Sequence, residues 1–173
     1  ASLWRPPFPA GNDRFILSVA CRWMSIGNTG TLAWKQSFPG GMGGAQPAVM
    51  GDLLVTQASG RSGKGRVEAL DLRTGDVRWR GQIGSSGKGV LPLEDGSGFL
   101  TTGYHYTGTV FEGSVSRHSV QDGRELWVFR RPGPPPSQLP LIDPSTGRAY
   151  VWFGDGTIVC LAVETGALAW ETR

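Results

Sequence analysis

Short, largely apolar runs that resemble β-strands, separated by glycine-rich turns, recur along the chain. Two of these runs are Leu53-Leu54-Val55-Thr56 and Arg66-Val67-Glu68-Ala69-Leu70, and two more are Arg148–Phe153 and Thr157–Leu161. Gly154-Asp155-Gly156 joins the last two runs, and a Gly/Asp turn between apolar runs is typical of a β-hairpin. No apolar run reaches 18 residues, so the pattern predicts short strands and no membrane-spanning helix.

A Gly-x-x-x-Trp pattern recurs four times, with its glycines 45, 48 and 43 residues apart. Glycine supplies the positive φ that a tight turn demands. Tryptophan buries a large apolar area, which we expect to lie against the neighbouring repeat. We therefore predict eight structural anchors between repeats: Gly30, Trp34, Gly75, Trp79, Gly123, Trp127, Gly166 and Trp170.

A proline recurs in phase with these turns, since Pro47, Pro92 and Pro140 precede the turn glycine by 26 to 31 residues. Proline suits the first residue of a strand. Each repeat is thus predicted to hold a short innermost strand that begins at the proline, two hairpin strands and a last strand that carries the tryptophan. Four-stranded units at this period are typical of a β-propeller. We predict an all-β propeller of about four blades in one domain, residues 1–173, with blades at 6–38, 45–83, 90–130 and 138–173.

Two repeats depart from the pattern. Asp13 lies 17 residues before Gly30, whereas Asp52 lies 23 residues before Gly75, so we expect the first repeat to lack a full hairpin. In the third repeat, we expect residues 104–108 to form a loop that either packs on its own blade or presents a recognition surface. The candidate interaction patch consists of Tyr104, His105, Tyr106 and Trp170.

Residues 67–79 and 154–170 resemble the repeat of the PQQ-like propellers, which include quinoprotein alcohol dehydrogenases and BamB-like outer-membrane assembly proteins. The resemblance implies a periplasmic or exported protein. Such propellers usually have seven or eight blades, so four blades imply either a small closed ring or half of a larger one. In a half ring, Trp170 has no next blade, and exposed apolar faces tend to find partners. We expect a second copy or a separate protein chain to complete the propeller.

Composition and charge argue against several classes of function. The net charge is +3 and the arginines are scattered, with Arg130-Arg131 the one adjacent pair, so no nucleic-acid surface is expected. Cys21 and Cys160 lie in apolar runs and are predicted to be buried free thiols. The segment Arg130–Pro136 is interpreted as a stiff linker between blades or as a docking peptide, and Trp4–Pro9 is similar.

Catalytic chemistry has little support in the sequence. By resemblance, a quinoprotein dehydrogenase would need calcium ligands, a catalytic Asp and an adjacent cysteine pair, and no such set is evident. Two Ser-Gly-Lys-Gly segments, 62–65 and 86–89, lack the remainder of a phosphate-binding loop. His118 is predicted to pack or face solvent rather than to bind a metal.

These observations favour a non-catalytic propeller scaffold that mediates protein–protein interaction or complex assembly. We predict no catalytic, cofactor-binding or metal residues. We expect PQQ and calcium to bind only under the alternative, in which the chain is part of a quinoprotein dehydrogenase. A propeller that senses a ligand or peptide is a further alternative.

Overall fold

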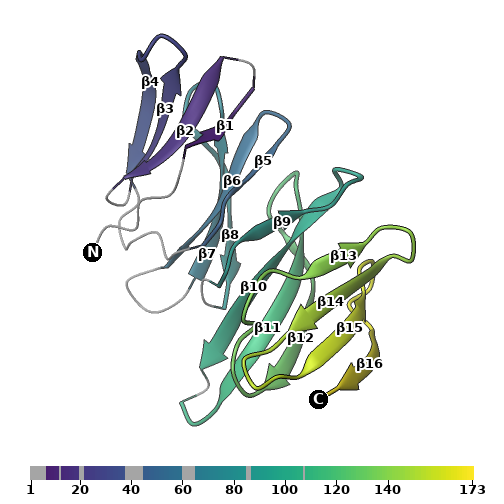
Figure 1. Ribbon diagram of the computed structural model, residues 1–173. Coiled ribbons are helices and arrows are strands. Elements are labelled where there is room, and N and C mark those ends of the chain that lie inside the picture. The colour runs from purple at the N-terminus through teal and green to yellow at the C-terminus, as the bar shows by residue number, and fades with distance from the viewer. Residues whose placement is uncertain are drawn as a thin grey trace.

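The computed structural model describes residues 7–11, 13–19, 22–37, 45–59, 65–84, 87–106 and 108–173. These residues form strands and turns and contain no helix, so nothing helical in them has the length and apolarity to cross a membrane. The strands pair into four antiparallel sheets of four, each in chain order. The sheets follow one another from the purple β1–β4 end to the yellow β13–β16 end (Figure 1). The predicted all-β propeller architecture is therefore confirmed.

Every sheet is one blade, in which a short innermost strand, two hairpin strands and an outermost strand follow in order. Blade 1 comprises β1 (Phe8–Pro9), β2 (Arg14–Val19), β3 (Arg22–Gly27) and β4 (Leu32–Ser37). Blade 2 comprises β5 (Ala48–Met50), β6 (Leu53–Ser59), β7 (Gly65–Asp71) and β8 (Val77–Ile83). Blade 3 comprises β9 (Val90–Pro92), β10 (Gly98–Tyr106), β11 (Phe111–Ser119) and β12 (Glu125–Pro132). Blade 4 comprises β13 (Leu141–Asp143), β14 (Arg148–Trp152), β15 (Ile158–Ala162) and β16 (Leu168–Thr172).

The first repeat contains a full hairpin, so the expectation that it lacks one is wrong. β2 and β3 pair along their whole length, from Arg14↔Gly27 to Val19↔Arg22. The repeat is shorter because both its strands and its connections are shorter, since β2 and β3 have six residues each whereas β6 and β7 have seven. Two residues separate β2 from β3, whereas five separate β6 from β7.

The proline landmarks do not all mark the same position. Pro47 and Pro140 directly precede β5 and β13, as predicted, but Pro92 is the last residue of β9, where it pairs with Phe99. The register follows the apolar residues instead, because Leu91 lies opposite the fully buried Leu100. A proline at the end of a short innermost strand removes little of the ladder, so the sheet tolerates this shift.

A β-bulge occurs at the same place in all four blades, where the second hairpin strand pairs with the outermost strand. In blade 2, Val77 and Trp79 are two residues apart but lie opposite the adjacent residues Leu70 and Ala69. The extra residue turns Val77 toward the core shared with blade 1 and Trp79 toward the core shared with blade 3. One outermost strand therefore contributes to two junctions.

The hydrophobic core is divided into layers that lie between successive blades. Val55 and Ala69 of blade 2, both with no exposed surface, pack with Phe99 of blade 3. The layer between blades 1 and 2 includes Ile16, Trp34, Leu54 and Leu70, and the layers between blades 3 and 4 include Leu100, Val115, Ala149, Val151 and Leu161. Each blade is thus stabilised mainly by its neighbours.

Candidate interaction surfaces

At each junction inside the chain, a tryptophan covers the turn glycine of the following blade. The indole N–H of Trp34 donates to the Leu72 carbonyl at 2.8 Å, and a Cβ placed on Gly75 would lie 2.6 Å from Cδ2 of Trp34. The φ of Gly75 is +78°, so both the conformation and the close contact require glycine here. The same arrangement joins Trp79 to Val120 and Gly123, and Trp127 to Val163 and Gly166.

The two remaining predicted anchors lie at opposite ends of the array (Figure 1). Gly30 also has a positive φ, +82°, but a Cβ placed there would meet nothing within 4 Å. Trp170 is 45% exposed, and its indole N–H has no acceptor among the described residues. Six of the eight anchors therefore meet in three pairs, while Gly30 and Trp170 remain uncovered.

The face of blade 4 that carries Trp170 is an uncovered blade face. Leu141, Tyr150, Cys160 and Trp170 lie opposite one another on four adjacent strands and so share one face, which we call the Trp170 face. The rings of Tyr150 and Trp170 are 6.0 Å apart, and Leu141 is 59% exposed. Cys160 lies beneath them as a buried free thiol, as predicted, while Cys21 lies outside the described residues.

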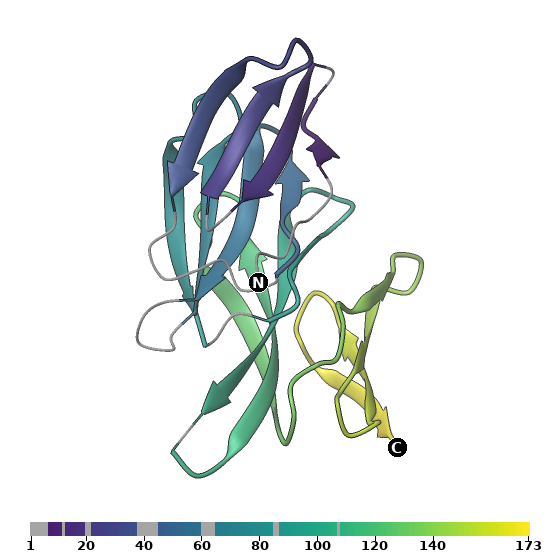
Figure 2. The same ribbon diagram turned by 60° about the vertical axis from the view of Figure 1, so that its left-hand side comes forward.

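Blade 3 has a longer hairpin than the other blades. β10 and β11 have nine residues each, whereas β14 and β15 have five. The pairing continues to Tyr106↔Phe111, so the expected loop is wrong for Tyr104–Tyr106, which extend β10. Aromatic residues are favoured in strands and pair well across them, which explains why the ladder continues. The end of this hairpin extends beyond the rest of the blade (Figure 2).

Three aromatic rings gather on one face of this extended hairpin. The ring of Phe111 lies 5.9 Å from that of Tyr104 and 4.8 Å from that of Tyr106. Their side chains are exposed, by 36% for Tyr104, 57% for Tyr106 and 53% for Phe111. We call these three residues the aromatic cluster. Exposed aromatic side chains in contact with one another are typical of protein-binding surfaces.

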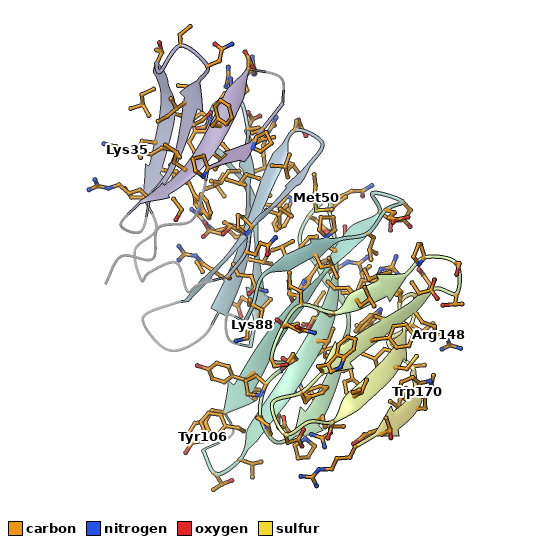
Figure 3. All side chains as sticks on the ribbon, viewed as in Figure 1. Lys35, Met50, Lys88, Tyr106, Arg148 and Trp170 are labelled. Carbon is orange, nitrogen blue, oxygen red and sulfur yellow. The ribbon has the colours of Figure 1, made fainter. Side chains whose placement is uncertain are left out.

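The predicted four-residue patch is divided by the structure. Tyr104 and Tyr106 lie together, but strand alternation turns His105 to the opposite face, where it lies against Gly84 of blade 2. Trp170 lies on the outermost strand of blade 4, away from Tyr106 (Figure 3). The sequence reasoning missed Phe111, although a continued hairpin would have placed it opposite Tyr106.

The proline-rich segment after β12 supports the base of the aromatic cluster. The N–H of Gly133 donates to the Phe111 carbonyl at 2.8 Å, and Pro136 bridges to Phe153 of blade 4. Gly113 lies under this segment, since a Cβ there would be 2.6 Å from the Pro134 carbonyl oxygen. The segment therefore runs as a linker between blades 3 and 4. Residues 4–6 of the other proline-rich stretch, Trp4–Pro9, lie outside the described residues.

An arginine clamp joins blade 3 to blade 4 beside this linker. The guanidinium of Arg131 donates to Asp155 at 3.0 Å, to the Thr157 hydroxyl at 2.9 Å and to Glu171 at 3.1 Å. It also lies over the Phe153 ring, 5.4 Å from the centroid. The Thr157 backbone N–H, and after it the Thr157 hydroxyl and Arg131, lower the pKa of Asp155 to about 2, against a smaller opposing effect of burial.

His118 belongs to the core of the junction between blades 2 and 3. Its ring has no exposed surface and stacks on Phe99 at 5.2 Å. Nδ1 lies 3.2 Å from the Gly123 carbonyl oxygen and donates to it, because a carbonyl can only accept. In a neutral ring, Nε2 is then an acceptor and receives the hydrogen bond of the Thr101 hydroxyl at 3.1 Å. Burial lowers the pKa of His118 below its usual value of 6.5 and thus favours the neutral ring. The predicted packing role is confirmed.

The described residues do not form a metal-binding cluster. No three His, Cys, Asp or Glu side chains among them gather closely enough to hold an ion.

Comparisons with known proteins agree with this fold. A family model described as outer membrane protein assembly factor BamB matches residues 24–173. BamB of Burkholderia pseudomallei is 29% identical over 171 residues, which cover 98% of this chain and 38% of that protein. Tetrathionate hydrolase of Acidithiobacillus ferrooxidans is 24% identical over 116 residues, 61% of this chain and 23% of that protein. The chain thus spans well under half the length of these relatives.

Solved propeller structures share the arrangement at low sequence identity. Quinohemoprotein alcohol dehydrogenase ADHIIG from Pseudomonas putida HK5 has a TM-score of 0.72 at 16% identity, covering 96% of this chain and 33% of its own. BamB from Moraxella catarrhalis has a TM-score of 0.63 at 17% identity, covering 97% and 51%. Likenesses at these identities show the fold alone. The family match, which covers most of the chain, shows that this protein belongs to the BamB family of PQQ-like β-propellers.

Proposed function

We propose that this chain is a non-catalytic propeller scaffold that binds other proteins during the assembly of a complex. The observation that carries the proposal is the aromatic cluster at the end of the long blade 3 hairpin. Tyr106 and Phe111 are each more than half exposed and contribute little to the packing of their own blade. Large aromatic side chains held rigidly on a hairpin supply contact area at a low cost in conformational entropy.

The family supports both the role and a location. The relative in Burkholderia pseudomallei is named an outer membrane protein assembly factor, which is a role in complex assembly. We extend this class of role to the present chain, with a periplasmic or outer-membrane-associated location. Another protein chain or a second copy covers the Trp170 face and so completes the propeller.

The proposal assigns no cofactor to the chain. The alternative function, part of a quinoprotein dehydrogenase, is tested by adding PQQ and Ca²⁺ to the purified protein. We expect neither a change in the absorption spectrum of PQQ nor a rise in the melting temperature. A rise that needs both additions would favour the quinoprotein function.

The binding surface is tested by cross-linking in cells. A photoreactive amino acid in place of Tyr106 is expected to form a discrete adduct with one or a few proteins, which mass spectrometry identifies. Leu126, 42% exposed on the outermost strand of the same blade, is the matched control position and is expected to give no such adduct. Equal adducts at both positions, or none at Tyr106, would contradict a specific surface at the aromatic cluster.

A further inference from the structure

The three junctions between blades differ in what reaches one turn carbonyl. Two residues before the turn glycine of blade 2, the Arg73 carbonyl accepts a hydrogen bond from Nη1 of Arg14 at 3.1 Å. At the same place in blade 4, the Glu164 carbonyl accepts from Nη1 of Arg117 at 3.1 Å. The equivalent carbonyl of blade 3 belongs to Gln121, and none of the described residues donates to it. The junction between blades 2 and 3 therefore lacks an arginine contact that the junctions on both sides have.

The two arginines come from different strands of their blades. Arg14 is the first residue of β2, whereas Arg117 lies on β11 opposite the tryptophan of the outermost strand. Blade 2 has Leu53 as the first residue of β6 and Ala69 opposite its tryptophan, and neither side chain can donate a hydrogen bond. Because two different positions supply the same contact, the arginine answers a requirement of the turn. Blade 2 provides no such residue for the turn of blade 3.

An open groove lies at the junction without the arginine. It has a volume of about 690 Å³ and is bounded by the first turns of blades 2 and 3 and by the last turn of blade 3, which includes Gln121. We call it the Gln121 groove. The equivalent hollow between blades 3 and 4, which Arg117 helps to line, has a volume of about 360 Å³. The larger hollow is thus at the turn whose carbonyl has no arginine.

The walls of the Gln121 groove suit the stem of a long side chain. Met50, Leu53, Trp79 and Pro92 contribute apolar surface to it. The first three pack against the core between blades 2 and 3 but are only partly buried, so part of each side chain faces the groove. Long basic side chains bury their methylene stems on apolar surface of this kind while the charged head keeps polar partners.

The charges that line the groove favour a cation. Arg78 is neutralised by Asp71, whose carboxylate accepts from Nε at 3.0 Å and from Nη2 at 2.6 Å. The carboxylate of Asp52 is exposed and has no hydrogen bond or ion pair within the described part of the chain. A carboxylate and a backbone carbonyl can only accept, so Asp52 and Gln121 both call for a donor. A guanidinium supplies five N–H donors and a positive charge, which matches both groups.

We propose that the Gln121 groove binds an arginine side chain of a partner protein, whose guanidinium donates to the Gln121 carbonyl as Arg14 and Arg117 do at the neighbouring turns. The inference rests on the proposed function in that the partner is a protein. It adds a second contact surface, since β10 begins beside the groove and ends at Tyr106 in the aromatic cluster. Met50, which lines the groove, accordingly lies far from Tyr106 (Figure 3).

The first test titrates the purified chain with N-acetyl-arginine N-methylamide and follows it by ¹H–¹⁵N NMR. We expect saturable shifts of the Trp79 indole N–H and the Gln121 backbone N–H, with a dissociation constant on the order of 1 mM for a single side chain. The signals of Trp127 and Glu164 are the internal control, because Arg117 already occupies their turn. N-acetyl-lysine N-methylamide is expected to bind at least about threefold more weakly, since an ammonium lacks the planar fork of donors.

A matched pair of substitutions at Leu53 tests the role of the missing arginine. Leu53→Arg supplies an arginine from within the chain at the position of Arg14, so we expect the dissociation constant of the arginine probe to rise at least about tenfold. Leu53→Met keeps an uncharged side chain of similar size and should leave it within about twofold. Asp52→Asn removes the unpaired charge and should raise it about threefold. Circular dichroism checks that each variant folds.

The protein partner is tested by cross-linking in cells from the groove itself. A photoreactive amino acid in place of Gln121 is expected to form a discrete adduct with a partner protein. Leu53→Arg should weaken this adduct at least about fivefold, whereas Leu53→Met, the matched control, should leave it unchanged. Neither substitution should change the adduct formed at Tyr106.

Four results would overturn the inference. If the arginine probe shifts the signals of Trp79 and Trp127 equally, or shifts neither, the groove does not select arginine. If the lysine probe binds as tightly, the groove accepts any cation. If folded Leu53→Arg binds the probe as the native chain does, the missing arginine does not define the site. If Gln121 forms no adduct, or one that Leu53→Arg leaves unchanged, no partner protein enters the groove. None of these results affects cross-linking at Tyr106, so the proposed scaffold function is tested separately.

Discussion

The two faces of blade 4 carry similar side chains in different surroundings. On one face, Ala149, Val151 and Leu161 have no exposed surface, because Trp127 and the rest of blade 3 cover them. On the opposite face, Leu141 is 59% exposed and Trp170 is 45% exposed. The comparison shows that both faces of a blade carry side chains suited to contact, whereas their burial depends on the presence of a neighbouring blade.

Replacing the tryptophans separates the two faces most strongly. Trp127→Ala removes a large side chain from a packed junction, and we expect it to lower the free energy of unfolding by about 3 kcal/mol. Trp170→Ala changes an uncovered face and is expected to cost less than about 1 kcal/mol. Urea unfolding followed by circular dichroism measures both. Equal losses would show that Trp170 is buried in solution, by self-association or by another contact.

The turn glycines give a smaller contrast. Gly166→Ala would place a Cβ 2.6 Å from the Trp127 ring at a φ of +70°, so we expect a loss of about 2 kcal/mol in unfolding free energy. Gly30 also has a positive φ, but a Cβ there would meet no neighbour, so we expect Gly30→Ala to lower the free energy of unfolding by about 1 kcal/mol. The same unfolding experiment measures the pair. A larger loss for Gly30 would show that its turn is covered.

The arginine clamp gives the smallest effect, which depends on pH. The folded-state pKa of Asp155 is about 2, below its ordinary value of 3.8, so its contribution to stability is present above about pH 4. That contribution is lost as the pH falls from about 4 toward 2. We expect Asp155→Asn to lower the melting temperature at pH 7 and to differ little from the native protein near pH 2. Asp143→Asn is the control, because Asp143 bonds Ser145 and Thr146 and no arginine, and its effect should be smaller. Equal shifts for both variants would exclude a role of the clamp.

Much of the fold was predictable because its signals are local. A positive φ at Gly75 and a large apolar side chain at Trp79 are requirements of one turn and one strand, and they recur with the period. The features that the sequence analysis predicted wrongly depend on the pairing between strands. The connection between β2 and β3, and the position of Pro92 within β9, follow from register, which buried neighbours determine.

The candidate surfaces were less predictable for a related reason. Tyr104 and Tyr106 stand out in the sequence, but whether they form a loop or a strand depends on their partner Phe111, which is five residues farther along. His105 is adjacent to both tyrosines in the sequence and was therefore expected in the same patch. In a strand, however, adjacent side chains point to opposite faces, so proximity in the sequence does not place them together. The uncovered state of Trp170 was predictable, since it follows from counting blades.

The bulge shared by all four blades also affects how the molecule can aggregate. An outermost strand has a free edge, and a straight edge of this kind invites another strand to add to it. The unpaired extra residue bends each outermost strand beside its turn, which disfavours a continuous ladder with a neighbouring molecule. Concentrated solutions of this chain are therefore not expected to form cross-β fibres through these outermost strands.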